Sequence, residues 1–289
     1  MHSVVCIGRT VRPKEQGAPM KLIALGVVAI LAAGSVGIAH ATPNMVQNGD
    51  FSSTSPNQTT PTQFNGNSGA CGIDGRSWGG EFVSGWTTNT SGYAVWYPGA
   101  AAASSVQACT RYGNTGNQYL PSTVTGAPTG TSSFLGLDGD MGVGYAELSQ
   151  TINGLTPGDK YTVSFYWAST QEMSRTGDTT ERFDVSLGSE LFPTATNSIG
   201  THGWSGWSKE SFTFTASSTS DILKFLSVGT PGGLPPFALL SDVSMVHNVP
   251  EPPVLALFGS GLFGLGLLTM IGRRRALRRR GADGASDVG

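Results

Sequence analysis

Residues 161–168 read YTVSFYWA, and this stretch decides the fold class. Its large side chains Tyr161, Val163, Phe165 and Trp167 stand at every second position, so all of them face one side of an extended chain. Alternation of this kind is typical of a β-strand with one buried face and one face toward water.

Further segments show the same alternation of apolar and polar residues. They are residues 183–187, 211–215, 223–226 and 242–246. Helical periodicity is almost absent, and the stretches 52–72 and 99–133 are rich in small polar residues. We therefore predict an all-β domain, an antiparallel β-sandwich (jelly roll) with long polar loops.

Residues 42–248 are enough for one all-β domain with a substantial core. This span holds 7 Lys and Arg against 15 Asp and Glu, a difference of −8 that the overall formal charge of −2 hides. Because a net acidic surface repels phosphate backbones, we expect no nucleic-acid partner.

The carboxyl-terminal residues carry a separate signal. Residues 254–271 contain no charged side chain, and as a helix they would rise about 27 Å, close to the roughly 30 Å hydrocarbon core of a bilayer. We predict a transmembrane helix there, with 281–289 as a disordered tail. Arginines, which are expected to stay in the cytoplasm, follow the helix at Arg273, Arg274, Arg275, Arg278, Arg279 and Arg280.

Pro250-Glu251-Pro252 stands directly before the apolar run, which a plain membrane anchor does not need. Residues 249–280 thus resemble the PEP-CTERM sorting signal of exported bacterial proteins. The resemblance implies recognition of Pro250, Glu251 and Pro252 by an exosortase, with the helix and basic tail removed or exchanged during delivery. An ordinary tail anchor is the alternative.

The amino-terminal residues also predict export. Lys21 precedes the apolar run 22–33, and Ala39 and Ala41 place small residues where signal peptidase requires them. We expect residues 1–41 to comprise an extension and a signal helix, with cleavage after Ala41 and Met20 as the true start.

With Cys6 outside the mature chain, Cys71 and Cys109 remain as an even pair in an oxidising compartment. We predict that they form a disulfide, worth about 4 kcal/mol on the chain-entropy model. Two free buried thiols are the alternative.

A second resemblance concerns the domain itself. Residues 48–51 (NGDF), 161–165 (YTVSF) and 239–243 (LLSDV) are similar to galactose-binding-like jelly rolls, a fold shared by carbohydrate-binding modules. The resemblance covers most of residues 44–246 and implies the fold more strongly than a ligand.

Related jelly rolls often hold a structural calcium ion between the first and last strands. Here Asn48 and Asp242 are the matching metal ligands, but Ser52 and Ser241 replace acidic or amide residues of the family pattern. We expect no cofactor, and the structural calcium stays open as an alternative. Asp138 and Asp140 form another acidic pair, more typical of a turn between strands.

Tryptophans are the residues most suited to binding, because flat indole faces stack on sugar rings. Trp167 continues the alternating strand and is assigned to the core. Those among glycines and polar residues are the candidate ligand-binding residues: Trp78, Trp86, Trp96, Trp204 and Trp207. Core or loop-filling roles are the alternative for them.

Catalytic patterns are missing from the sequence. There is no Gly-x-Ser-x-Gly motif, and His202 and His247 stand in no metal or triad spacing. No spacing pairs the carboxylates that a glycosidase would need, among Glu147, Glu172, Glu181 and Asp184. We predict no catalytic residues and no enzyme activity.

These patterns together predict an exported protein, first held in the inner membrane through residues 254–271 and then delivered to the cell surface or extracellular matrix. Its expected partners are signal peptidase and an exosortase during export, and exopolysaccharide afterwards. We expect the ectodomain to be a non-catalytic polysaccharide-binding module. A structural surface or biofilm protein without a small ligand is the alternative.

Overall fold

The computed structural model describes residues 42–55, 57–64, 82–89, 91–104, 118–130, 133–142 and 144–249. The chain divides into two compact units, Met1–His40 and Ala41–Gly289, and all described residues belong to the second. Within this described part, no helix is long and apolar enough to cross a membrane. Several predicted features lie outside the described residues: the signal segment with Ala39 and Ala41, Cys71, Trp78, Cys109, the motif 250–252 and the arginines 273–280.

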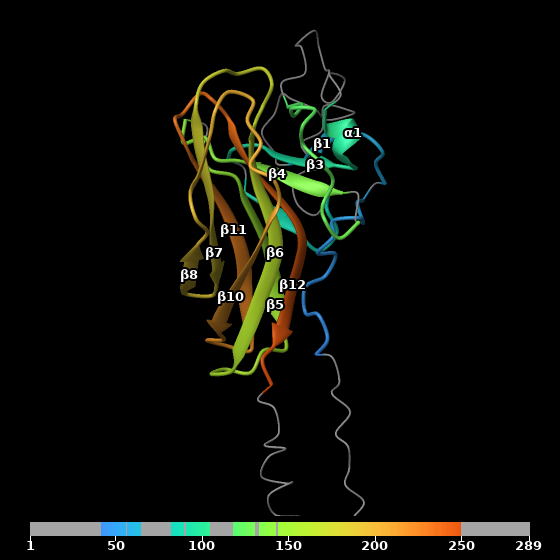
Figure 1. Ribbon diagram of the computed structural model, residues 1–289. Helices are drawn as coiled ribbons and strands as arrows, with labels where there is room; N and C mark the ends of the chain where they lie inside the picture. The colour runs from blue at the N-terminus through green and yellow to red at the C-terminus, as the bar shows by residue number, and fades with distance from the viewer. Residues whose placement is uncertain are drawn as a thin grey trace, which may run out of the picture. The chain divides into compact units, whose positions relative to one another are not determined.

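Two antiparallel sheets form the domain (Figure 1). Sheet 1 contains, in spatial order, β1 (Thr62–Gln63), β3 (Ala94–Tyr97), β4 (Phe134–Asp138), β12 (Pro236–His247), β6 (Lys160–Gln171) and β10 (Ser208–Thr215). Sheet 2 contains β2 (Thr87–Thr88), β5 (Glu147–Asn153), β11 (Ser220–Thr230), β7 (Thr179–Leu187) and β8 (Glu190–Pro193), with β9 (Asn197–Ile199) paired to β7. A single short helix, α1 (Ala100–Ala103), occurs among the described residues. The predicted all-β class with antiparallel sheets is confirmed.

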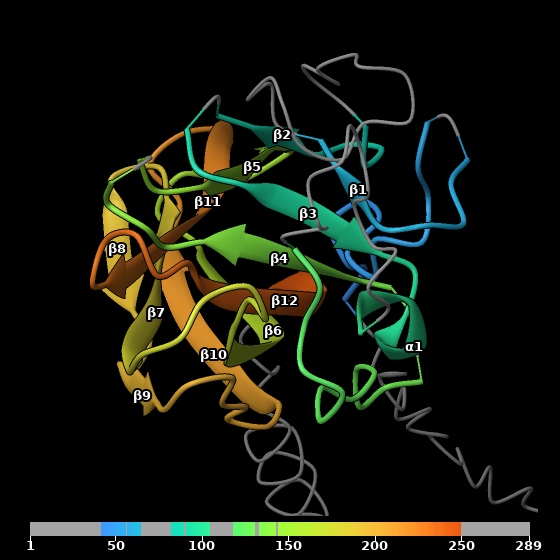
Figure 2. The ribbon, with the colours of Figure 1, turned by 90° about the horizontal axis from the view of Figure 1, so that it is seen from above.

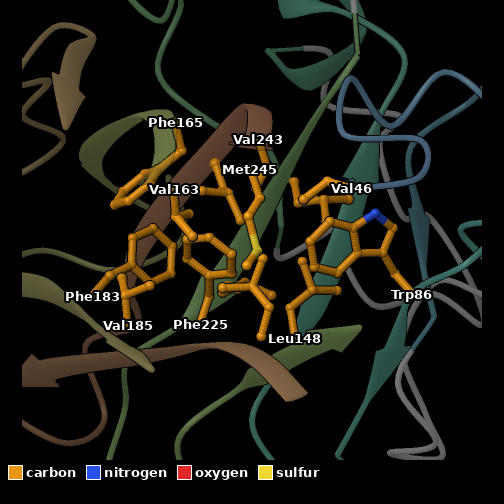
Figure 3. Close-up of a cluster of buried hydrophobic side chains, with 14 of the residues drawn as sticks. Val46, Trp86, Leu148, Val163, Phe165, Phe183, Val185, Phe225, Val243 and Met245 are labelled. Atoms are coloured by element: carbon orange, nitrogen blue, oxygen red, sulfur yellow. The ribbon is translucent and has the colours of Figure 1, made fainter. Parts of the chain in front are cut away.

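The main core fills the space between the sheets (Figure 3). On β6, Tyr161, Val163, Phe165 and Trp167 are all buried, as their alternation predicts. Phe225 of β11 meets them from the other sheet, and its ring lies 5.1 Å from that of Phe165 with an edge-to-face angle of 83°. Aromatic pairs prefer this geometry, so the contact fixes how the two sheets pack.

A second, smaller core lies on the opposite face of sheet 1, at one end of the domain (Figure 2). Segments without strand structure cover it, including α1 and residues 118–130. Its buried members are Val95, Tyr97, Ala103, Leu120, Val124, Phe134, Ala168, Phe237 and Leu239. Sheet 1 is therefore buried on both faces at this end.

The described chain enters and leaves the domain at the other end (Figure 1). The Met45 N–H donates to the Met245 carbonyl at 2.9 Å, and the Met245 N–H donates to Asn44 Oδ1 at 2.9 Å. His247, the last residue of β12, lies opposite Tyr161 near the start of β6. The first and last residues of the described chain thus lie at the same end of the sandwich.

Replacement of Phe225 tests the main core. The side chain is fully buried and its ring also lies 5.8 Å from that of Phe183, so Phe225→Ala should lower the free energy of unfolding by roughly 3–5 kcal/mol. Urea denaturation measures this change. Ile222→Ala, on the same strand but with 50% of the side chain exposed, serves as the control and should cost less than about 1 kcal/mol. Equal losses for the two variants would contradict the assigned facing of β11.

Candidate ligand-binding face

The outer face of sheet 1 is apolar at the end away from the termini. Gly136 of β4 lies between Val95 of β3 and Leu239 of β12, and Leu239 lies beside Ala168 of β6. We call this surface the outer face, and define it by the side chains of Val95, Tyr97, Phe134, Ala168, Phe237 and Leu239. Such a run of apolar residues across four strands is unusual for a sheet surface that looks outward.

Gly136 lets aromatic rings lie flat across this face. A Cβ at this position would come within 3.0 Å of Tyr97 Cε2 and 3.1 Å of Phe237 Cδ1. The Tyr97 ring stacks on that of Phe134, with 5.2 Å between centroids and 29° between planes. The missing side chain therefore makes room for a layer of rings.

Trp204 and Trp207 extend the aromatic layer to its margin, where both side chains are half-buried. Their rings meet edge to face with 5.7 Å between centroids, and the Trp207 ring contacts that of Phe134 at 5.7 Å. The Trp207 indole N–H donates to the Thr125 carbonyl at 2.9 Å. The structure thus brings together these two of the predicted binding residues.

The loop that carries both tryptophans is fastened to the end of β6. Thr170 forms an isolated antiparallel bridge with Trp204, and its hydroxyl donates to the Gly203 carbonyl at 3.0 Å. The Ser205 N–H donates to the Ser169 carbonyl at 3.0 Å. These bonds hold the indoles beside the outer face in the folded protein.

The outer face of sheet 2 is different in chemistry. Arg182 Nε donates to Asp184 Oδ1 at 2.8 Å, and Lys224 Nζ lies 3.0 Å from Glu147 Oε2. All four side chains are partly exposed, as expected for a sheet surface in water. Glu147 and Asp184, two of the carboxylates that we considered for glycosidase chemistry, are therefore engaged in surface ion pairs.

Carboxyl groups collect at the end of the apolar layer. Asp138 ends β4 and its N–H donates to the Tyr93 carbonyl at 2.8 Å. Burial raises the pKa of Asp138 to about 8, and the charges of Asp140 and Glu172 add to the rise, against a hydrogen bond from the Asp140 N–H. Oδ2 of Asp138 is buried without a hydrogen-bond partner among the described residues.

Glu172 and Tyr93 belong to the same cluster. Burial raises the pKa of Glu172 to about 7, although Ser174 donates hydrogen bonds to it. The pKa of the half-buried Tyr93 is raised by burial and then by the nearby carboxylates of Asp138 and Glu172. At the end of the outer face, the carboxyl groups of Asp138 and Glu172 thus lie near Tyr93. Their pKa values of about 8 and about 7 mean that both can be neutral near pH 7.

Glu181 is a different buried acid, on the inward-facing side of β7. Burial raises its pKa well above the usual range, although Ser227 Oγ donates to Oε1 at 3.0 Å. Gly139 and Gly229 pack directly against its carboxyl group, since a Cβ at either position would lie within 2.6 Å of Oε2. This tight enclosure leaves Glu181 no access to a ligand at the outer face.

Trp86 and Trp96 are core residues, with 0% and 4% of their surface exposed. The Trp86 indole N–H donates to the Asn48 carbonyl at 3.1 Å, and the Trp96 indole N–H donates to the Phe51 carbonyl at 2.8 Å. Their polar atoms are satisfied inside the domain. We therefore assign both tryptophans to packing, the alternative that the sequence left open. Side chains buried to this degree do not fit the predicted ligand-binding role.

Asn48 and Asp242 lie near each other through a close backbone contact. The Val243 N–H donates to the Gly49 carbonyl at 2.9 Å, and a Cβ on Gly49 would lie 1.9 Å from the Val243 oxygen. Asn48 Oδ1 accepts from the Ser53 N–H at 3.0 Å, and Asp242 Oδ2 accepts from the Thr129 hydroxyl. Protein donors thus bond to Asn48 Oδ1 and Asp242 Oδ2, and the structural calcium stays a prediction.

No three His, Cys, Asp or Glu side chains are placed to hold a metal ion in the described ranges. The residues of this candidate site that sequence analysis did not single out are Tyr93, Phe134 and Phe237. For Phe237, the signal that indicates it is the loss of alternation at 236–241, where a strand becomes buried on both faces.

No family model and no curated protein matches this chain. Among solved structures, it is similar to TmCBM61 in complex with β-1,4-galactotriose, with 15% identity, a TM-score of 0.36 and coverage of 72% of this chain and 100% of that one. The C-terminal CBM6 of LamC from Zobellia galactanivorans has 13% identity and a TM-score of 0.25, covering 40% of this chain and 81% of that one.

Another similar structure is the enzymatically active domain of tailspike protein 4 of bacteriophage CBA120, with 12% identity and a TM-score of 0.33. The match covers 71% of this chain and 21% of the tailspike chain. Because all three TM-scores lie below 0.5, these similarities do not assign a ligand or an activity to this chain.

The buried acid Asp138 makes a pH-dependent prediction. Its folded pKa of about 8 lies above the ordinary 3.8, so the folded state keeps a proton that the unfolded chain loses, and stability falls as pH rises between these values. Asp138→Asn removes this titration and keeps the acceptor Oδ1. Relative to wild type, the variant should gain roughly 2–5 kcal/mol of unfolding free energy between pH 4 and pH 8.

Urea denaturation at both pH values gives the comparison. Asp178→Asn, at an exposed position on the same end of the domain, is the control and should follow the wild-type pH dependence. An unchanged pH slope in Asp138→Asn would show that Asp138 is ionised in the folded protein.

Proposed function

We propose that residues 42–248 form a non-catalytic polysaccharide-binding module of an exported surface protein. The observation that carries this proposal is the half-buried Trp204–Trp207 pair, continuous with the apolar outer face of sheet 1. Sheet 2 offers no comparable aromatic layer among its described outward-facing residues. The binding side is therefore the side of sheet 1.

The chemistry of the margin suits a sugar chain. The apolar faces of pyranose rings stack on indoles, while their hydroxyl groups need hydrogen-bond partners at the edge. Tyr93, which is half-buried at the same end of sheet 1, provides a hydroxyl group. Binding by stacking and hydrogen bonds requires no covalent chemistry, which agrees with the absence of a catalytic pattern from the sequence.

The margin also lies far from the chain termini. Thr170 and Lys160 are near opposite ends of the single strand β6. At about 3.3 Å per residue, the intervening strand places the tryptophan loop about 30 Å from the point where the chain enters and leaves. A module anchored through its termini would thus present these tryptophans away from the anchor.

Substitution of the margin tryptophans tests the binding proposal. Trp204→Ala and Trp207→Ala should each weaken binding to the best of three probes, soluble galactan, xylan and laminarin, by about tenfold or more, which corresponds to roughly 1.4 kcal/mol. Affinity electrophoresis and tryptophan fluorescence measure the binding, and circular dichroism checks the fold. Phe192→Ala, an exposed aromatic change on the edge strand β8, is the matched control.

Equal affinity of wild type and both tryptophan variants would contradict the site. If no polysaccharide binds at all, the structural alternative gains support, and one observation already favours it: Leu191 and Phe192 leave 55% and 38% of their surfaces exposed on an edge strand. Exposed apolar groups at a sheet edge suit contacts with other proteins.

For delivery, we propose processing by signal peptidase after Ala41 and recognition of Pro250-Glu251-Pro252 by an exosortase, with residues 254–271 as a transient anchor. Release to the cell surface or matrix then removes or exchanges the arginine tail. A disulfide between Cys71 and Cys109 belongs to the same proposal, because the mature domain would reside in an oxidising compartment. These steps rest on the sequence motifs.

Intact mass spectrometry of protein from fractionated native cells checks delivery. The expected mature species begins at Thr42, ends within residues 250–253, lies outside the membrane, and is lighter by two hydrogens before reduction. A Glu251→Ala variant should accumulate in the membrane with Arg280 retained, while a Glu210→Ala control should be processed normally. Wild-type protein that keeps Arg280 in the inner membrane would identify an ordinary anchored ectodomain.

A further inference from the structure

Residues 118–130, which we call the strap, lie over the outer face of sheet 1. Leu120 and Val124 are buried against it, with 1% and 4% exposed, and Ala127 is also buried at 7%, while residues 122, 123, 125 and 126 are exposed. The strap contains no helix and no strand, so its backbone is not paired with either sheet. Its hold on the outer face comes from small apolar contacts and a few hydrogen bonds.

The strap uses the groups that a ligand would use. Its Thr125 carbonyl accepts the Trp207 indole N–H at 2.9 Å, and its Gln118 carbonyl accepts the Tyr97 hydroxyl at 2.7 Å. Leu120 and Val124 belong to the same cluster as Phe134 and Leu239. A polysaccharide would stack on these rings and bond these same N–H and O–H groups.

The surface beneath the strap consists largely of aromatic rings, which suit a flat partner such as a sugar ring. Tyr97 and Phe134 stack with 5.2 Å between centroids, and Gly136 leaves space for the Tyr97 and Phe237 rings. From the strap, the aliphatic side chains of Leu120 and Val124 join this cluster, and no aromatic ring of the strap does. At the end of this surface, buried Asp138 Oδ2 has no hydrogen-bond partner among the described residues, which leaves a carboxyl oxygen that can form a hydrogen bond with a sugar hydroxyl.

We propose that the strap is an autoinhibitory cover that occupies the ligand platform in the free protein and is displaced when a polysaccharide chain binds across the outer face. This inference rests on the proposed binding function and extends the site from the exposed tryptophans to the whole aromatic layer. The half-buried Trp204–Trp207 pair is the first contact, and the rings beneath the strap become available when it lifts.

Displacement has a thermodynamic consequence. If only a fraction of molecules has the strap lifted, the apparent affinity is lowered by that fraction, and a change that loosens the strap restores affinity without any new ligand contact. Val124 is suited to this test because it is buried on the strap and belongs to no strand of the sandwich. Its side chain contributes to the cover and not to the platform.

Val124→Ser should therefore bind the best of the soluble galactan, xylan and laminarin probes about tenfold more tightly than wild type. Ile222→Ser, the same kind of apolar-to-serine change at a half-exposed position on the outer face of sheet 2, is the control and should bind like wild type. Affinity electrophoresis gives both values in one experiment. Unfolding midpoints confirm that both variants are folded.

Hydrogen exchange of the unmodified protein provides an independent measurement. The Leu120 N–H of the strap donates to the Ala103 carbonyl at 2.8 Å, and the Met173 N–H donates to the Tyr119 carbonyl of the strap at 3.0 Å. Saturation with the probe should speed exchange at both amides by at least about tenfold, because a lifted strap loses these bonds. Exchange on β11 should stay unchanged or slow.

The outcomes separate this inference from the function on which it rests. Tighter binding by Val124→Ser with faster exchange at Leu120 and Met173 supports the cover. A different result overturns the cover and leaves the binding function intact. In that case wild-type binding depends on Trp204 and Trp207, Val124→Ser binds as wild type or more weakly, and exchange at the two amides is unchanged or slowed. Failure of both proteins to bind any probe overturns both.

Discussion

Sheet 1 is buried on both faces along the half of β6 and β12 that lies away from the chain termini, and the rest of the structure depends on this constraint. In β6, alternation from Lys160 gives way to unbroken burial from Trp167 to Gln171. In β12, unbroken burial from Pro236 to Ser241 precedes alternation. The paired strands thus change from one-sided to two-sided burial at the same level, and the outward side at that end needs a cover.

The cover determines where chemistry can occur. The strap, α1 and the tryptophan loop shield the outer face, but none of these segments adds a strand to sheet 1. Loops of this kind open at lower free energy than paired strands, because fewer backbone bonds must break. The carboxyl groups of Asp138 and Glu172 are enclosed at the same end, and their raised pKa values follow from that enclosure. The sandwich therefore carries the proposed binding end beneath segments that are less strongly held than its paired strands.

The sequence predicts the main core well because alternation is a local property. Tyr161, Val163, Phe165 and Trp167 need no knowledge of their partners to be placed on one face. The candidate site is less predictable, since it depends on contacts between distant segments. In the sequence, Trp86 and Trp96 stand among glycines, as Trp204 and Trp207 do. The structure shows that Trp86 and Trp96 are core residues whose indole N–H groups bond to the carbonyls of Asn48 and Phe51, far away in sequence. The second pair is half-buried on its loop, and its binding role stays a prediction.

The central claim is that ligand binds on the outer side of sheet 1, and indole N–H resonances test it most directly. In a nitrogen-15 spectrum of labelled protein titrated with the bound polysaccharide, the signals of Trp204 and Trp207 should shift with the same saturation curve. Those of Trp86 and Trp96, satisfied by internal carbonyls, should stay in place. Saturable binding that leaves the Trp204 and Trp207 signals unmoved would contradict the account.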